Sequence, residues 1–334
     1  MNKNMKMCSM LLGLVLFAAC SSDDDEVVAP QPELYPLTIE VSETPMQSEG
    51  GGAAGARAFR APITTTSSLT QFNLNYVYNS IAGGATVVAK STDGRWVHTE
   101  GADKGWPNDA ANNDHMVTWY ATTNGTFYLD ENDPYISFSG EEYANAQHDL
   151  LVAKTADKWS VCGGHLFFTF DHACTALRFF VKKATNLNDY TLNISQVRLC
   201  HVVKHGQYHL DSNTWELTNS AATDFTDYTL YTGDAFTLGS AEYIPLYGPY
   251  NKADEPYLFL IPQTLTNWNP TEALSNTYLE ITCTLKKGNE SANTFSGTAY
   301  IPFAATLQKG YQNDVKINIG KNSLYSGTNT KIIN

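Results

Sequence analysis

Short runs in which apolar and polar residues alternate recur along the chain, and they predict β-strands rather than helices. In residues 72–78, apolar or aromatic side chains occupy every second position, and Asn73 and Asn75 lie between the first three of them. Residues 192–199 keep this pattern with a shift near Ser195, which predicts a β-bulge. Turns are predicted at Asp93-Gly94, Asn124-Gly125 and Lys309-Gly310. The pattern predicts an all-β fold of the sandwich type.

The first amphipathic strand is expected at residues 35–43, where Leu37, Ile39 and Val41 alternate with polar residues. A small-residue linker follows at 48–56, and then come Arg57 and Arg60. A trypsin-like protease that cut there would separate the strand from everything downstream. The alternative is a simple tether whose strand stays packed on the first sheet.

The last clear alternation lies at residues 311–319 and predicts a strand with one buried and one wet face. Its apolar side chains are Tyr311, Val315, Ile317 and Ile319. Beyond Gly320, apolar residues are only scattered.

The first twenty residues predict an export signal. Lys3 and Lys6 precede an apolar run at 11–19, which is too short to span a bilayer. The run ends at Ala19-Cys20 and resembles the bacterial lipobox, so we expect a signal peptide at 1–19, lipidation of Cys20 and a tether at 20–34. The alternative is an ordinary secretory signal beside an incidental cysteine.

An acidic run at 21–26 resembles the surface-export signal of Bacteroidetes lipoproteins, or it is a solvated spacer. No later segment is apolar enough to cross a membrane, so lipid is the expected anchor. These features predict a lipid-anchored, surface-exposed protein of the cell outer membrane.

Composition restricts the classes of function. The chain has 334 residues, is 43% hydrophobic and 12% aromatic, and carries a formal net charge of −13. Such a chain can fill two domains of ordinary size. Its acidity disfavours binding to nucleic acid.

Four cysteines would remain after export, an even number that permits two disulfides or none. They are Cys162, Cys174, Cys200 and Cys283, and their apolar surroundings favour free, buried thiols. Because His205-Gly206 is predicted to form a hairpin turn, His201 and His209 should point to opposite faces. We therefore expect no metal site and no cofactor.

The chemistry-bearing pairs favour structural interpretations. Glu141-Glu142 and Asp130-Glu131 are sequence neighbours, which rarely act as the paired acid and base of a glycosidase. His172 beside Asp171 is expected to be a hydrogen-bonded structural histidine. Since no known catalytic motif is present, we predict that the chain is not an enzyme.

Aromatic residues leave a second function open. Six tryptophans and nineteen tyrosines can provide stacking platforms for sugars or fill sandwich cores. The tryptophans are Trp96, Trp106, Trp119, Trp159, Trp215 and Trp268. The alternative function is therefore a monomeric surface glycan-binding lipoprotein.

Several weak motifs in a fixed order resemble one family, the fimbrillin-like proteins of the Bacteroidetes, which are subunits of type V pili. In order, the motifs are Phe72-Asn73-Leu74, Gly105-Trp106-Pro107, Val117-Thr118-Trp119-Tyr120, Tyr135-Ile136-Ser137-Phe138, 148–153, Phe170-Asp171-His172-Ala173, Tyr208 to Trp215, Leu260-Ile261-Pro262-Gln263 and Gly310-Tyr311. The resemblance covers most of the chain after Cys20.

The resemblance implies two tandem transthyretin-like β-sandwich domains, at 35–163 and 164–334. It implies that a protease removes the first strand, here Leu37, Ile39 and Val41, after Arg57 or Arg60. A neighbouring pilin subunit would then add a donor strand, whose counterpart here lies within 311–334 and includes Tyr311, Val315, Ile317 and Ile319. The expected function is a stalk, tip or anchor subunit of a fimbrium, with a host or bacterial surface as a further ligand.

Overall fold

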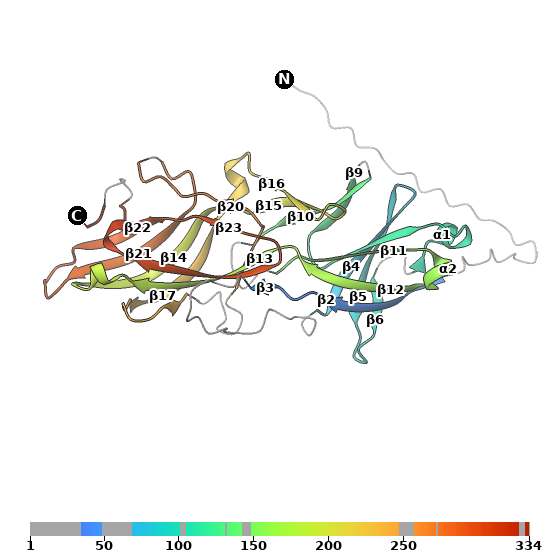
Figure 1. Cartoon of the computed structure of the whole chain (residues 1–334), viewed down its shortest axis with the longest axis horizontal. Coiled ribbons are helices and arrows are strands. Elements are labelled where there is room, and N and C mark those ends of the chain that lie inside the picture. The colour runs from blue at the N-terminus through green and yellow to red at the C-terminus, as the bar shows by residue number, and fades with distance from the viewer. Residues whose placement is uncertain are drawn as a thin grey trace, which may run out of the picture. The chain divides into compact units, whose positions relative to one another are not determined.

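The computed structural model describes residues 35–48, 69–100, 105–130, 132–141, 148–246, 257–271, 273–326 and 331–333 (Figure 1). Strands make up most of these residues. The two α-helices among them are short, α1 (Asn108–Asn112) and α2 (Trp159–Cys162). The predicted all-β class is confirmed. Cys20, Arg57 and Arg60 lie outside the described residues.

A seven-stranded sheet forms the first layer. Its order is β2 (Thr38–Glu43), β12 (His165–His172), β11 (Leu151–Asp157), β8 (Val117–Thr122), β4 (Gln71–Tyr78), β5 (Ile81–Lys90) and β6 (Trp96–Glu100). All neighbours are antiparallel except β2 and β12, which are parallel. Side chains of β12 alternate strictly between exposed and buried. One face of the sheet holds a core that includes Phe72, Trp119 and Phe168.

A four-stranded antiparallel sheet packs against the other face. It consists of β16 (Thr214–Thr218), β15 (His205–His209), β10 (Asp133–Ser139) and β9 (Thr126–Asp130). Ile136 and Tyr208 of this sheet share a buried cluster with Tyr120 and Val152 of the seven-stranded sheet. The small sheet therefore covers part of the large one.

The predicted turn at His205-Gly206 is wrong. Both residues lie within β15, which pairs with β10 and β16, and the chain turns instead between His209 and Thr214. Glycine fits in this strand because a Cβ at Gly206 would come within 3.2 Å of the Trp215 ring. An aromatic ring over a strand glycine thus explains the residue without a turn.

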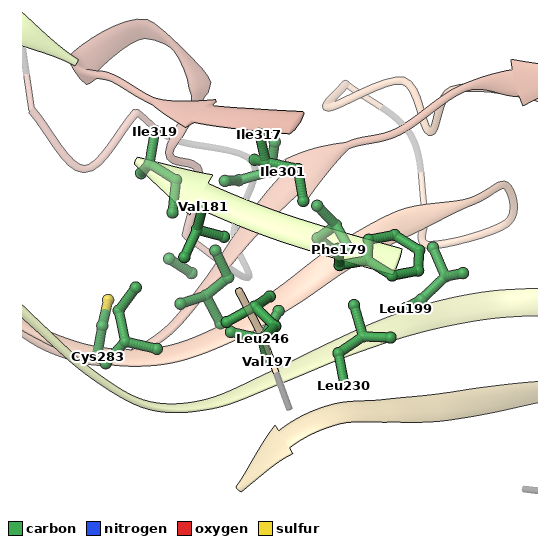
Figure 2. Packing of buried hydrophobic residues seen from close by; sticks show 14 of the residues in the cluster. Phe179, Val181, Val197, Leu199, Leu230, Leu246, Cys283, Ile301, Ile317 and Ile319 are labelled. Carbon is green, nitrogen blue, oxygen red and sulfur yellow. The ribbon is translucent and has the colours of Figure 1, made fainter. Parts of the chain in front are cut away.

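Two further sheets enclose the largest core. One is mixed and contains β18 (Ile244–Pro245), β13 (Thr175–Lys183), β24 (Tyr311–Ile319) and β3 (Gln47–Ser48), with β19 (Leu258–Leu260) also paired to β13. The other is antiparallel and contains β17 (Phe225–Thr237), β14 (Tyr190–Val203), β21 (Tyr278–Lys287) and β22 (Phe295–Pro302). Figure 2 shows Phe179, Val181 and Ile317 of the first sheet in the same packed cluster as Val197 and Leu199 of the second.

The remaining elements are small. β1 (Tyr35–Pro36) pairs with β7 (Gly105–Trp106), and β20 (Thr264–Leu265) pairs with β23 (Ala305–Thr306). Short 3-10 helices occur at Thr185–Leu187, Ala222–Asp224 and Lys321–Ser323. The predicted bulge near Ser195 is confirmed, because the register of β14 with both neighbours shifts between Ile194 and Gln196.

The chain passes from the seven-stranded sheet to the mixed sheet between β12 and β13. The strand at 166–170, expected to open a second domain after residue 163, pairs with β11 and β2. Sheet membership gives no single division, because β15 and β16 join the sheet of β9 and β10, and β3 joins the mixed sheet. The two tandem transthyretin-like domains stay a prediction.

The four described cysteines are free thiols, and Cys174, Cys200 and Cys283 are buried. Burial raises the pKa of Cys283 to about 12. Among the helices that the structure describes, none has the length and apolar character needed to cross a membrane.

Candidate functional site

The segment Tyr35–Ser48, here called the N-terminal strap, pairs with three separate elements. β1 pairs with β7, β2 runs parallel to β12, and β3 runs parallel to β24. Backbone bonds outside these ladders also hold it, from the N–H of Thr38 to the Gly164 carbonyl (2.9 Å) and from that of Thr44 to the Phe170 carbonyl (2.8 Å). The strap therefore links the edge of the seven-stranded sheet to the mixed sheet, as Figure 1 shows in blue.

The strap buries one face, as the sequence predicts. Ile39 is 6% exposed and belongs to the first core, against which the half-buried Leu37 and Val41 pack. Met46 is also buried, at 2% exposure. Glu40, between these residues, is exposed. Because β2 is the outermost strand of its sheet, its loss would uncover both the β12 edge and this apolar surface.

A buried charged group lies at the end of the strap. Nε2 of His172 lies 3.1 Å from Oε1 of Glu43, and its Nδ1 forms a very short hydrogen bond with Asp149. The side chains of His172 and Glu43 are each 2% exposed, and that of Asp149 is 10% exposed. Asp149 also accepts a hydrogen bond from the backbone N–H of Cys174, 3.3 Å.

These contacts determine the charge of the imidazole. Burial by itself lowers the pKa of His172, but its bonds to Asp149 and Glu43, with their negative charges, outweigh burial and raise that pKa to about 9. At neutral pH the ring is therefore a cation between two carboxylates. One of the two carboxylates belongs to the strap.

His172 was expected to be a hydrogen-bonded structural histidine, and the structure gives it that role with different partners. Its sequence neighbour Asp171 points to the exposed side of β12. Sequence reasoning missed Glu43 and Asp149. The available signal was the period of two, which continues from Val41 to Glu43 and puts that carboxylate on the buried face.

A close passage of the backbone fixes the start of the strap. Gly164 has a φ of +83°, and a Cβ there would come within 2.4 Å of the Pro36 carbonyl oxygen and 2.6 Å of the Trp159 ring. Gly163 also has a positive φ, +58°, but open space surrounds the position of its Cβ. Only at Gly164 does the strap itself require glycine.

The predicted donor residues lie in a strand that is built into the molecule. β24 pairs with β13 from Gln312 to Ile319. Ile317 and Ile319 are buried in the largest core, and Val315 packs against it. Arg178 of β13 adds a bidentate ion pair with Asp314, with two hydrogen bonds of 2.7 Å.

The described tail after β24 is also docked. Leu324 and Ile333 are 1% and 5% exposed and belong to the same core. Tyr325 forms a two-bond bridge with Tyr300 at the edge of β22 and packs edge-on against Trp268. From the sequence, the apolar residues beyond Gly320 were only scattered, but in the structure they hold the tail against the core.

The structure does not support the other candidate sites, which were sugar-stacking platforms, carboxylate pairs and metal ligands. All six tryptophans are buried or half-buried, which favours core packing over sugar platforms. Asp130 and Glu141 are exposed, and their neighbours Glu131 and Glu142 lie outside the described residues. Among the described residues, no group of His, Cys, Asp and Glu side chains could hold a metal ion.

Comparison with known proteins identifies the family. The model of the fimbrillin-like family matches residues 63–332, so the chain belongs to this family. The resemblance expected from the ordered motifs is confirmed. No curated protein matches the chain.

Solved structures of fimbrial and cell adhesion proteins are also similar to the chain. A fimbrial protein from Bacteroides vulgatus has 17% identity and a TM-score of 0.49, and the match covers 84% of this chain and 95% of that one. A candidate cell adhesion protein from Bacteroides ovatus has 12% identity and a TM-score of 0.47, with 87% and 94% covered. Because these identities and scores are low, the family assignment rests on the family model.

Proposed function

We propose that the chain is a structural or adhesive subunit of a type V pilus, in which the N-terminal strap is removed and a strand of another pilin subunit takes its place. The observation that carries this proposal is the position of β2, an edge strand that covers apolar core and is joined to the body through a segment bearing Arg57 and Arg60. Membership of the fimbrillin-like family supports a role at the cell surface among other pilin subunits.

Processing is proposed to occur after Arg57 or Arg60. A cut there breaks the covalent link between the strap and β4, while the ladder with β12 and the buried Ile39 and Met46 still hold the strap in place. Cleavage is therefore the permissive step, and replacement of the strap is a separate step that an incoming strand drives.

The energetics favour a long-lived joint. A strand that buries about four apolar side chains in the vacated groove gains on the order of 6–12 kcal/mol before ordering costs. Ladder hydrogen bonds add about 1 kcal/mol each. Since donor and acceptor surfaces differ, the contact is heterologous and generates filaments rather than closed rings.

The packing of β24 supports the acceptor role more strongly than the donor role. To donate residues 311–319, the chain would have to withdraw Ile317 and Ile319 from its largest core and break the Arg178–Asp314 pair. We therefore propose this chain as an acceptor, which fits the tip, with the donor strand supplied by another subunit; a place in the stalk would require it to donate a strand as well. An uncut chain would act as an anchor.

The remaining attributes follow from the leader and the family. We propose that lipid on Cys20 holds the uncut chain on the outer membrane, and that the processed chain belongs to the fimbrium. A host or bacterial surface is the proposed further ligand. No cofactor and no catalytic activity are included in this proposal.

The test is made in the bacterium that produces the chain, where its partner subunits are present. In pili sheared from the surface, the wild-type chain should begin after Arg57 or Arg60 and run in ladders that resist SDS. The double variant Arg57→Ala, Arg60→Ala should keep residues 35–48 and be missing from the ladders. Equal incorporation of both forms would overturn the proposed processing step.

A further inference from the structure

The buried face of β2 ends in a charged residue. Leu37, Ile39 and Val41 point toward the first core, and two residues later Glu43 continues the same face, with its side chain 2% exposed. A carboxylate at such a position is costly to bury unless a partner receives it. The partner is the buried His172–Asp149 pair described above.

Removal of the strap would leave this pair without one of its two carboxylates. His172 is the last residue of β12, so its ring lies at the end of the edge that β2 occupies. The register pairs Phe170 with Glu43. A strand that took the place of β2 in this register would bring the residue at Glu43's position to Nε2 of His172.

We propose that the groove under β2 binds a strand of defined chemistry: three apolar residues at alternate positions, followed two residues later by Asp or Glu, running parallel to β12. The His172–Asp149 pair is the group that recognises this carboxylate. This inference rests on the proposed function, because it concerns the strand that replaces the strap.

The physical basis of selection is the cationic ring. A carboxylate at the 3.1 Å distance of Glu43 neutralises it, whereas an apolar side chain leaves the buried cation with one counter-charge fewer. An amide can accept a hydrogen bond but carries no charge. Glutamine should therefore bind more weakly than glutamate, and leucine more weakly still.

The chain's own C-terminal strand does not meet this requirement. β24 has the correct apolar spacing at Val315, Ile317 and Ile319, but the residue two positions further on is Lys321. In the register of β2, that lysine would place a second cation beside the imidazolium of His172, which is unfavourable. The strand that fits best comes from a different subunit and carries an acidic residue there.

The experiment uses the mature chain cut by limited trypsin, and the probe is a fluorescent peptide of residues 35–48, added in excess so that it exchanges with the strap that the cut chain retains. Unlabelled peptides then compete for the groove, and fluorescence anisotropy gives their relative affinities. Replacement of Glu43 by Gln should weaken competition by about tenfold, and by Leu by up to about a hundredfold. The matched control is Glu40→Gln, which removes the same charge from the exposed face and should change affinity by less than about twofold.

A peptide of residues 311–325 extends the test to the chain's own strand. Its Lys321→Glu form should compete better than the unaltered sequence. All of these comparisons leave the body unchanged, so no result depends on whether a His172 variant folds. Where His172→Gln does fold, it should remove the preference for Glu43 over Gln.

The outcomes separate the two proposals. If no peptide enters the groove of the cut chain, strand replacement fails, and the inference fails with it. If the peptides enter but Glu43, Gln and Leu forms compete equally, strand replacement stands and the carboxylate requirement is wrong. A loss of competition by Glu40→Gln as large as that by Glu43→Gln would reduce the effect to general charge and would also refute it.

Discussion

The buried imidazole of His172 should make the stability of the protein depend on pH in a defined window. In the folded chain its pKa is about 9, against an ordinary value of 6.5. A group whose pKa is raised by folding contributes stability that is fully present below the unfolded pKa and lost as the pH rises through the folded pKa. The contribution of His172 should therefore decline between pH 6.5 and pH 9.

The magnitude follows from the two pKa values. Linkage gives a loss of about 2 kcal/mol in the free energy of unfolding between pH 6 and pH 8, and about 3 kcal/mol over the whole window. The neighbouring Cys174 does not confound this range, because burial raises the pKa of its thiol and keeps it neutral. Interactions of other histidines cancel when two variants are compared at the same two pH values.

The assay is urea unfolding at pH 6 and pH 8 of the wild-type chain and of His172→Gln. The wild type should lose about 2 kcal/mol more than the variant over this interval. Glu43→Gln keeps the ring but removes one of its carboxylates, so its loss should be intermediate. An identical pH dependence of wild type and His172→Gln would show that the ring is not a cation between its two carboxylates, and the reasoning would fail.

Two further substitutions test how the strap is held. Ile39→Ala should cost about 2–5 kcal/mol in the uncut chain and shorten the lifetime of the strap on the cut chain, whereas Thr38→Ala on the exposed face should leave that lifetime nearly unchanged. Gly164→Ala should also release the strap faster, because its Cβ meets the Pro36 carbonyl, while Gly163→Ala should cost only about 1 kcal/mol of backbone strain. Mass spectrometry of the cut chain after gel filtration measures how much strap is retained. Equal retention by Gly164→Ala and Gly163→Ala would contradict the close contact between Gly164 and the Pro36 carbonyl.

Local pattern was sufficient to predict several strands of this fold but not their partners. The period of two predicted that Ile39 is buried and that residues 311–319, now β24, form a half-buried strand. Side-chain alternation can be recognised without knowing the neighbouring strand. His205-Gly206 was misread as a turn because the pairing of β15 with β10, a strand distant in sequence, outweighs a local turn signal. The ring of Trp215 over Gly206, which explains that glycine, is a tertiary contact that no local rule supplies.

The candidate site, too, could be predicted from the sequence only in part. The strap's apolar face could be read from the sequence, but its charged end could not, since Glu43, Asp149 and His172 come from three distant segments. Their pairing depends on the parallel register of β2 with β12. Neither the direction of that pairing nor its partner is encoded in residues 35–43 alone.

The most direct test of the account is to lock the strap in place. Ser42 and Thr169 are register partners on β2 and β12, with their hydroxyl oxygens 3.0 Å apart, so cysteines at both positions are placed to form a disulfide. In the bacterium that produces the chain, Ser42→Cys, Thr169→Cys should form this bond, keep the strap after cleavage and be excluded from SDS-resistant pilus ladders. The single variant Ser42→Cys should enter them. Incorporation of the locked chain at the wild-type level, with its disulfide intact, would contradict the claim that the strap is exchanged for a strand of another subunit.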